Sequence, residues 1–359
     1  MKASFAIPGD LETRTGGYGY ARALIAAAPK AGLTLTHLPL PDGFPHPTAE
    51  ALDRTRAVLS ATQGPLLIDG LALGVLPAEW VRALHGPVIA LCHHPLALET
   101  GLTGDVATML AQTEAAALSA CAEVIVPSPA TARDLGEIGV PAHKLTVAPP
   151  GLERARAASR LGDPPVILSV GTLTPRKGHD VLIDALAAIV ALPWHCVIAG
   201  PVDRDPVWAE MLFRRAAASG LSERVTFAGA QDSDGLNALY AAADIFCLPS
   251  RHEGYGMVFA EAMMRGLPVI AARSGAVPDL VPTREADDVG AAGLLVPPGE
   301  APALGAAIEA LLRDPMRRGA LAAAARAHAL SLPEWDDTAR IVADLFRSAE
   351  PTNAAVNQV

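Results

Sequence analysis

The sequence predicts an α/β fold with two doubly wound parallel-sheet domains. Its 359 residues exceed the roughly 100–200 residues of a single domain. Short, continuous apolar runs occur in two successive series, and such runs are typical of strands buried on both faces. Ala-rich stretches with helical spacing lie between the runs, as parallel strands joined by helical crossovers require.

The predicted strands are four or five residues long in most cases and rarely alternate polar with apolar side chains. The first series comprises Ser4–Ile7, Thr34–Leu38, Pro65–Ile68, Val88–Cys92, Val124–Val126 and Leu145–Val147. The second series comprises Val166–Val170, His195–Ala199, Val225–Phe227, Ile245–Leu248, Val269–Ala271 and Gly293–Val296.

Helices are predicted between these strands from the spacing of their apolar residues. The last of them has Pro302 at its start, where a proline is tolerated. The predicted helices are Tyr20–Ala31, Asp105–Cys121, Ala130–Leu135, Asp180–Ala191, Val207–Ser219, Leu236–Ala242, Phe259–Arg265 and Ala303–Arg313.

A polar segment between the two series, Gly151–Pro165, is the predicted linker, because it ends in Gly and Pro between two strands. We therefore expect a first domain over residues 1–160 and a second over 161–330. Residues 350–359 are expected to be a flexible tail. A ligand is expected in a cleft between the domains, at the carboxyl ends of the strands.

Composition excludes several function classes. The net charge is −10 with no basic stripe, so no nucleic-acid partner is expected. No apolar run reaches the ~18 residues of a transmembrane helix, and the apolar part of the first ten residues is too short for a signal peptide. The four cysteines lack metal-site spacing and are expected to be buried thiols. These features predict a cytoplasmic protein, and they leave open its oligomeric state and a peripheral contact with the inner membrane face.

The strongest motif follows the predicted strand Ile245–Leu248. A loop with Gly254 and Gly256 leads into a helix, and a helix N-terminus offers N–H groups and positive dipole charge to a phosphate. Glu253 and Glu261 flank this helix start with seven residues between them, so they can reach different parts of one phosphorylated ligand. The alternative is that Glu253 caps the helix and Glu261 is solvated.

A second motif carries one of only four lysines in the chain. The strand Val166–Val170 ends at Gly171, and Arg176 and Lys177 follow in the loop before the next helix. Two cations at the carboxyl end of a buried strand indicate an anion site. The alternative is a solvated basic loop.

Together these motifs resemble the retaining glycosyltransferases of the GT-B fold, specifically glycosyltransferase family 4. The resemblance covers nearly the whole chain and includes the Glu-x7-Glu pair, the Gly171–Gly178 loop, Pro249-Ser250 and the segment Gly293–Gly299. Two departures are Thr172, where the family often has Arg, and the loop Ser274–Asp279, which is similar to the family's Gly-Gly-x-Pro-Glu element.

The resemblance implies a transfer of a hexose-like sugar from a nucleotide-diphosphate donor to a saccharide or lipid-linked hydroxyl. By that resemblance Arg176 and Lys177 neutralise the diphosphate, Glu253 binds donor-sugar hydroxyls and Glu261 binds the ribose. The second domain is then the donor domain, the first binds the acceptor, and a C-terminal helix over 331–349 returns to the first. Further donor contacts are implied for Gly171 and for the backbone of Gly254, Tyr255, Gly256, Met257 and Val258.

The first domain resembles the family more weakly. Gly16 and Gly17 follow the first strand and are similar to the family's Gly-Gly loop near the donor phosphate, although a bare glycine turn is the alternative. A strand ending in His93 and His94 matches a position where the family often has a histidine near the donor sugar. We favour His93 as the catalytic residue, while the sequence does not settle the choice between the two.

No essential metal or other cofactor is expected. Two Asp-x-Asp triplets, Asp203–Asp205 and Asp232–Asp234, could hold a metal-bound nucleotide sugar, but both precede predicted helices, so helix capping is favoured. Two alternative functions remain: a nucleotide-sugar epimerase of the same architecture, and a non-catalytic nucleotide-sugar binder. The donor sugar, its base and the acceptor are not evident from the sequence.

Overall fold

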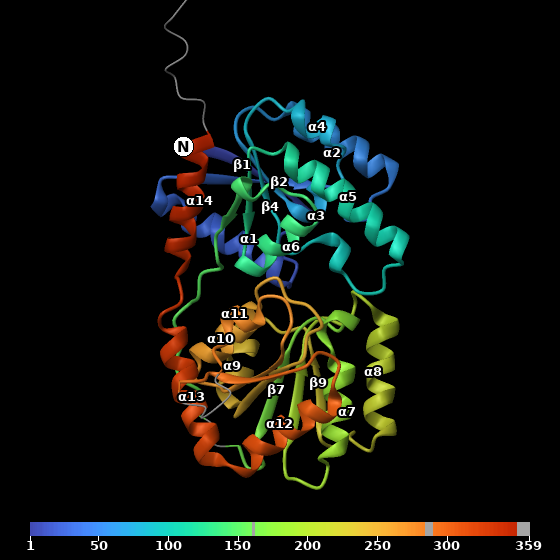
Figure 1. The fold of residues 1–359 in the computed structure, drawn as a ribbon, viewed down its shortest axis with the longest axis vertical. Coiled ribbons are helices and arrows are strands. Elements are labelled where there is room, and N and C mark those ends of the chain that lie inside the picture. Colours follow the sequence, from blue (N-terminus) through green and yellow to red (C-terminus); the bar gives the residue numbers. More distant parts are fainter. Residues whose placement is uncertain (160–161, 284–289, 350–359) are drawn as a thin grey trace, which may run out of the picture. The chain divides into compact units, whose positions relative to one another are not determined.

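The computed structural model describes residues 1–159, 162–283 and 290–349, and the chain divides into two compact units. The first unit comprises Met1–Gly151 together with the chain from Pro333 onward, and the second comprises Leu152–Leu332. Each unit is a parallel sheet with helices on both sides (Figure 1). The division after Gly151 falls within the segment predicted as a linker. The predicted tail, 350–359, lies outside the described residues.

The first unit is built on a six-stranded parallel sheet of order β2-β1-β3-β4-β5-β6. The chain leaves β1 toward β2 on one side and returns to β3 on the other, so the strand order reverses between β1 and β3. Ligands of doubly wound sheets bind outside the carboxyl ends of the strands at such a point. The strands are β1 (Lys2–Pro8), β2 (Thr34–Leu40), β3 (Leu66–Asp69), β4 (Val88–Leu91), β5 (Glu123–Val126) and β6 (Leu145–Val147).

The last helix of the chain, α14 (Trp335–Ala349), packs into the core of this first unit. Its side chains Val342 and Phe346 are buried in one cluster with Phe5 and Leu24. The other helices are α1 (Gly16–Ala27), η1 (Ala28–Ala31), α2 (Ala49–Ala61), α3 (Gly70–Leu73), α4 (Ala78–Arg82), η2 (Leu96–Leu98), α5 (Gly104–Ala120), α6 (Pro129–Glu137) and η3 (Ala142–Lys144).

The second unit has its own six-stranded parallel sheet, of order β12-β11-β10-β7-β8-β9. Relative to the first strand of this unit, this is the 3-2-1-4-5-6 arrangement of dinucleotide-binding folds, and the order reverses between β7 and β10. The strands are β7 (Val166–Val170), β8 (His195–Ala199), β9 (Val225–Gly229), β10 (Ile245–Leu248), β11 (Val269–Ala272) and β12 (Gly293–Val296).

Two separate hydrophobic clusters cover the two faces of this sheet. One contains Ile167 with residues of α7, α8 and α12, and the other contains Leu168 with residues of α9, α10 and α13. Adjacent residues of β7 thus point into opposite cores, which explains the continuous apolar run. The helices are η4 (Pro175–Lys177), α7 (His179–Ala188), α8 (Pro206–Ala218), α9 (Ser233–Ala242), α10 (Met257–Met264), α11 (Val277–Leu280), α12 (Ala301–Arg313) and α13 (Pro315–Ala329).

All twelve predicted strands are present, with ends that differ by at most two residues. Two long helices, α2 and α13, were not predicted from the apolar pattern. Helix α2 buries Ala51, Thr55 and Leu59, a stripe one residue wide, and α13 buries mostly alanines. A stripe this narrow, or one made of side chains this small, gives a weak periodic signal in the sequence.

The preference for helix capping at the Asp-x-Asp triplets is confirmed. Asp205 accepts a hydrogen bond from the Trp208 N–H at the start of α8, and Asp232 accepts one from the Gly235 N–H at the start of α9. The expectation of buried thiols is also confirmed, because all four cysteines are buried and unpaired. Within the described ranges no helix is both long and apolar enough to cross a bilayer.

Candidate functional site

The candidate site of the second unit lies where its strand order reverses. The loop after β7 carries Arg176 and Lys177 on the short helix η4, and the loop after the adjacent strand β10 carries Glu253. The carboxyl ends of parallel strands share one edge of the sheet, so the two motifs that the sequence singled out meet here.

Glu253 and Lys177 form a buried ion pair. The Lys177 Nζ donates to Glu253 Oε1 at 2.6 Å, and the two side chains are 14% and 6% exposed. The Arg176 Nη1 lies 3.9 Å from Glu253 Oε2 and donates to the His252 carbonyl at 3.1 Å. One carboxylate is therefore surrounded by two cations, and the cluster has a net positive charge.

Neighbouring backbone and hydroxyl groups hold Glu253 in place. The Ser250 hydroxyl donates to Glu253 Oε1 at 2.6 Å, and the Ser274 hydroxyl donates to the Ser250 carbonyl at 2.6 Å. Gly275 has φ +52°, and a Cβ there would lie 2.2 Å from the Glu253 carbonyl oxygen. The loop Ser274–Asp279 thus supports Glu253, a role that the sequence did not predict.

The electrostatics of the cluster keep Glu253 ionised. Burial alone would raise the pKa of Glu253, but the charges of Lys177 and Arg176 and the hydrogen bonds from Lys177 and Ser250 outweigh burial and lower the pKa to about 2. Both alternatives from the sequence fail here. Glu253 makes no cap hydrogen bond at α10, and the basic loop is not solvated.

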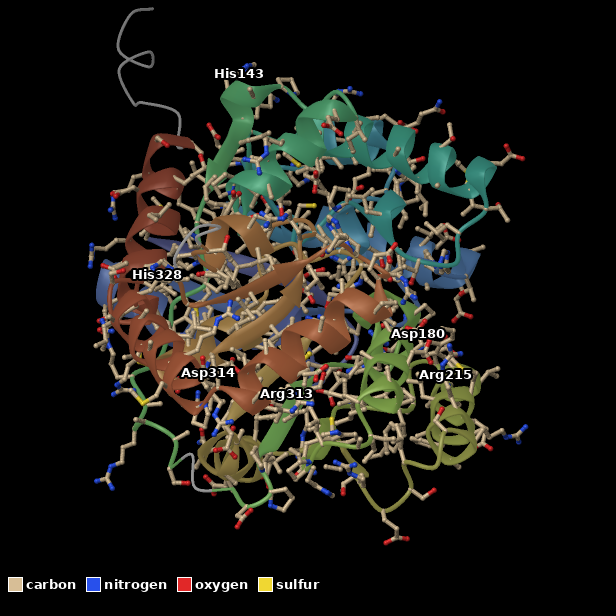
Figure 2. The ribbon with its side chains drawn as sticks, turned by 60° about the horizontal axis from the view of Figure 1, so that its bottom comes forward. His143, Asp180, Arg215, Arg313, Asp314 and His328 are labelled. Carbon is tan, nitrogen blue, oxygen red and sulfur yellow. The ribbon has the colours of Figure 1, made fainter. Side chains whose placement is uncertain are left out.

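A second ion pair joins the two loops. Arg251 donates to Asp180 with two nitrogens, at 3.0 and 2.7 Å, and also to the Pro175 carbonyl. Its own N–H donates to the Arg176 carbonyl at 2.7 Å. Asp180 lies in the first turn of α7 (Figure 2). This bidentate pair fixes the spacing between the cationic loop and the Glu253 loop.

Glycines allow the close approaches on which these loops depend. At Gly171 a Cβ would lie 3.3–3.5 Å from the aliphatic carbons of Lys177, so the lysine stem lies along this glycine. Gly256, with φ +91°, precedes α10, and a Cβ there would lie 2.4 Å from the Phe259 ring. Met257 and Val258 form the first turn of α10, and burial raises the pKa of Tyr255, in the loop before it, to about 12.

Glu261 lies in the second turn of α10 and is held by Tyr240 of α9. The Tyr240 hydroxyl donates to Glu261 Oε2 at 3.0 Å, and burial raises the pKa of Glu261. The alternative of a solvated Glu261 is therefore wrong. Tyr240 was not predicted as a site residue, because no local sequence pattern marks it as one.

In the first unit the structure brings Gly17 and His93 together. A Cβ at Gly17 would lie 3.1 Å from the His93 ring, whereas a Cβ at Gly16 would meet nothing within 4 Å. His93 Nε2 lies 3.6 Å from Asp69 Oδ2 at the end of β3. His94 Nε2 instead lies 3.5 Å from Glu99 Oε2, a carboxylate that is 43% exposed. The geometry distinguishes the two histidines, and the choice of His93 stays a prediction.

A buried carboxyl lies beneath the same loop. Glu114, on α5, accepts from the Leu96 N–H at 2.8 Å, and the Cys92 thiol donates to it at 3.7 Å. Burial raises the pKa of Glu114 to about 7. Its two partners flank His93 and His94 in the chain, so Glu114 fixes the backbone that carries both histidines.

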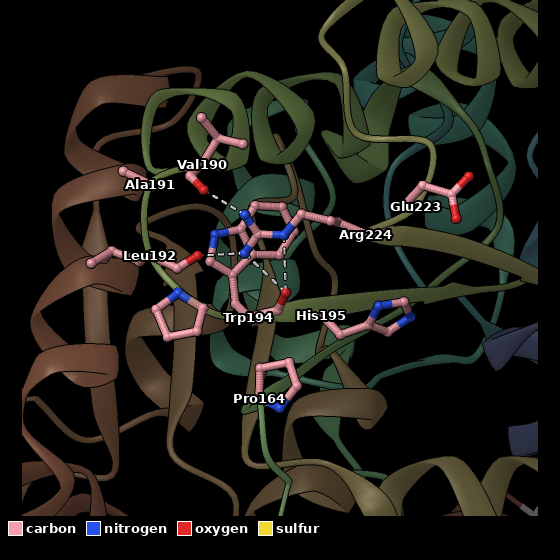
Figure 3. Close-up of a pocket in the computed structure, with 9 residues that line it drawn as sticks. Pro164, Val190, Ala191, Leu192, Trp194, His195, Glu223 and Arg224 are labelled. Atoms are coloured by element: carbon pink, nitrogen blue, oxygen red, sulfur yellow. Dashed lines mark hydrogen bonds between the residues drawn. The ribbon is translucent and has the colours of Figure 1, made fainter.

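Neither a metal cluster nor the depression shown in Figure 3 offers an alternative site. Among the described residues no group of three or more His, Cys, Asp or Glu side chains gathers to hold a metal ion. The depression lies at the amino ends of β7 and β8, and its cation, Arg224, stacks on Trp194 at 3.8 Å and donates to the carbonyls of Val190, Leu192 and Trp194. Arg224 therefore stabilises a loop.

The chain has the GT-B fold, and solved structures share this fold over nearly its whole length. Sucrose-phosphate synthase from Thermosynechococcus elongatus matches with a TM-score of 0.81 at 23% identity, over 97% of this chain and 98% of that one. The Anabaena protein HepE in complex with UDP-glucose matches with a TM-score of 0.78 at 19% identity, over 97% of this chain and 100% of that one.

Family models place the chain more narrowly. The model described as "Glycosyltransferase Family 4" matches residues 34–156, and the model described as "Glycosyl transferases group 1" matches residues 153–328. The chain belongs to glycosyltransferase family 4, as its motifs predicted.

Curated relatives carry related names. A GDP-mannose-dependent alpha-(1-6)-phosphatidylinositol monomannoside mannosyltransferase of Mycolicibacterium smegmatis is 34% identical over 215 residues, which is 58% of this chain and 54% of the relative. A D-inositol 3-phosphate glycosyltransferase of Acidothermus cellulolyticus is 32% identical over 261 residues, which is 66% of this chain and 55% of the relative. The chain thus spans about half the length of the curated relatives it matches.

Proposed function

We propose that this chain is a retaining glycosyltransferase of glycan or glycolipid biosynthesis. It moves a hexose-like unit from a nucleoside-diphosphate sugar to the hydroxyl of a saccharide or lipid-linked acceptor. The observation that carries the proposal is the buried cluster of Arg176, Lys177 and Glu253 at the point where the strand order of the second unit reverses.

The chemistry of sugar transfer explains why such a cluster is useful. A nucleoside diphosphate leaves as the sugar becomes oxocarbenium-like, and fixed positive charge at the leaving group lowers the barrier. Arg176 and Lys177 supply that charge, together with the N-terminus of α10. Glu253 then binds hydroxyls of the donor sugar, and Glu261 binds the ribose. In the first unit, we propose His93 as a catalytic residue and the Gly16-Gly17 loop as a donor contact.

Metal independence is part of the proposal, because two side chains and a helix end supply the positive charge that a metal supplies elsewhere. Turnover is expected to be unchanged in excess EDTA. Complete loss of turnover that Mn²⁺ restores would contradict this part.

Relatives and structural neighbours suggest which ligands to try first. The Mycolicibacterium smegmatis relative is named for GDP-mannose, and a structural neighbour is titled as a complex with UDP-glucose. The relatives' names include phosphatidylinositol monomannoside and D-inositol 3-phosphate. We propose a cytoplasmic enzyme that contacts the inner membrane face where its acceptor is lipid-linked.

A thermal-shift screen with UDP, GDP, ADP and their sugar conjugates tests the proposal, since a ligand that binds the folded state raises the melting temperature. Conjugates that shift the melting temperature then go into turnover assays with inositol phosphate and lipid-linked acceptors. No shift with any of these ligands would contradict the proposal. Epimerised donor without acceptor would indicate an isomerase, and binding without turnover would indicate a non-catalytic binder.

A further inference from the structure

Tyr240 is a buried residue that the sequence motifs did not single out, yet it contacts one of the two motif glutamates. It lies near the end of α9 and has no exposed surface. Its hydroxyl lies 3.0 Å from Glu261 Oε2 and 3.2 Å from the Val258 carbonyl oxygen. A phenol has one proton to donate, and a carboxylate is the stronger of these two acceptors.

The ring of Tyr240 is held between two neighbours, so its hydroxyl has little freedom to move. Phe246 of β10 stacks on the ring at 6.0 Å with an interplanar angle of 26°. The Arg265 guanidinium lies 4.5 Å from the ring centroid, and its Nη1 donates to the Glu261 carbonyl at 3.0 Å. Arg265 thereby ties the Tyr240 ring to the same helical turn as Glu261.

The two oxygens of Glu261 therefore have different surroundings. Oε2 accepts from Tyr240, whereas no hydrogen bond reaches Oε1 from any residue that the structure describes. A carboxylate accepts up to about four hydrogen bonds. Glu261 is thus held by one oxygen in a single orientation and presents the other to a ligand.

We propose that Tyr240 is a positioning residue that orients Glu261 to accept the hydroxyls of a nucleotide ribose. The inference rests on the proposed function, since it assumes a nucleotide at α10, and it adds how the chain distinguishes a ribose from a deoxyribose. Loss of the Tyr240 hydroxyl would leave Glu261 able to rotate, and a rotating acceptor recognises a hydroxyl less well.

Binding measurements on the full chain test the inference without depending on activity. Isothermal titration calorimetry gives the Kd for UDP, GDP and ADP, and for the 2′-deoxy form of whichever binds. We expect the wild type to prefer the ribonucleotide by about ten- to a hundredfold, as a hydrogen bond to a charged group allows. In Tyr240→Phe we expect this preference to fall below about threefold, while the Kd of the deoxynucleotide stays nearly constant.

A matched control is Tyr20→Phe, because Tyr20 is equally buried and donates its hydroxyl to the Ala148 carbonyl at 3.0 Å in the first unit. This variant should keep the wild-type ribose preference. If Tyr240→Phe does not fold, Glu261→Asp takes its place, since the shorter side chain cannot hold both Tyr240 and a ribose.

Several results would overturn the inference. One is an unchanged ribose preference in Tyr240→Phe, or in Glu261→Asp where that variant replaces it. Another is a loss of the preference in Tyr20→Phe equal to the loss in Tyr240→Phe. A wild type that binds nucleotides without any ribose preference would overturn the inference and leave the proposed function standing. A wild type that binds no nucleotide would overturn both.

Discussion

Each unit of this chain buries a glutamate near the carboxyl ends of its strands, and the surroundings of the two glutamates shift their pKa values in opposite directions. Glu253 of the second unit has the Lys177 ammonium at 2.6 Å and the Arg176 guanidinium at 3.9 Å. Glu114 of the first unit has a backbone N–H and the Cys92 thiol as its hydrogen-bond partners. The pKa of Glu253 is lowered to about 2, whereas that of Glu114 is raised to about 7.

The difference shows what each glutamate contributes. A buried carboxylate paired with two cations stays charged and leaves a net positive cluster at the loop, which suits an anionic ligand. A buried carboxyl without a cation takes up a proton near neutral pH, and it serves to hold backbone. Under the proposed function the ion-paired glutamate takes part in ligand binding, whereas the other glutamate supports the loop that carries His93.

The largest effect is expected from removing the charge of Lys177. In Lys177→Ala the Glu253 carboxylate stays buried with Arg176 as the more distant cation, and breaking such a pair costs about 3–5 kcal/mol of unfolding free energy. Donor kcat/KM should fall by at least about a hundredfold, because the proposed role of this charge is to stabilise the leaving group. Urea unfolding and steady-state kinetics measure the two effects.

Two further variants separate stability from function. Lys177→Met combined with Glu253→Gln removes both charges, so it should regain most of the stability and none of the activity. Arg215→Ala breaks an exposed pair with Asp184 and should cost less than about 1 kcal/mol. Wild-type kcat/KM in Lys177→Ala would contradict the phosphate-binding role.

The next effect is a pH dependence of stability from Glu114. Its pKa is about 7 in the folded chain and near the ordinary 4.5 in the unfolded chain. Between these values the folded state binds more protons, so the unfolding free energy decreases as pH rises from about 4.5 to about 7 and is constant above. The loss should be about 3 kcal/mol.

Comparison of the wild type with Glu114→Gln isolates the contribution of Glu114 to the pH dependence of the unfolding free energy. His179 is buried and uncharged with its pKa lowered to about 3 by burial, so it opposes Glu114 below pH 6.5. Both chains contain His179, and its contribution cancels in the difference. Urea unfolding at pH 5.0 and pH 7.5 should show a gap between the two chains that changes with pH; a constant gap would contradict the raised pKa.

The sequence predicted the strands and singled out the charged residues that meet in the candidate site, but it did not predict the residues that support them. Continuous apolar runs identify strands buried on both faces, and all twelve were found. Glu253, Arg176 and Lys177 were predicted because strand-loop-helix signals place them at the carboxyl edge of a sheet.

Residues that act through contacts distant in sequence were missed. Asp180 and Arg251 are 71 positions apart, and Tyr240 lies 21 positions before Glu261, which was itself predicted, so no local spacing links the members of either pair. Glu114 lies on the buried stripe of α5 with Leu110 and Leu118, but a charged side chain gives no apolar signal there. Its burial depends on the loop that follows β4, which local patterns do not describe.

The smallest effect concerns the charge that Glu253 adds to its cluster. Arg176, Lys177 and Glu253 sum to +1, and Glu253→Gln raises the sum to +2 while keeping an oxygen near Lys177 and Ser250. A nucleoside diphosphate without sugar should therefore bind about three- to tenfold more tightly, with a steeper dependence on salt. Turnover should fall, because the proposed contact of Glu253 with the donor sugar is lost.

Calorimetry with UDP or GDP at two ionic strengths measures this change. Glu309→Gln is the control, because it removes a charge of the same type from an exposed pair with Arg313 and should leave the nucleotide Kd unchanged. Weaker nucleotide binding in Glu253→Gln would mean that Glu253 mainly holds Lys177 in position, rather than competing with the nucleotide phosphates for the charge of Lys177. Both buried glutamates would then serve to position their neighbours, and the two units would differ only in whether the buried glutamate is charged.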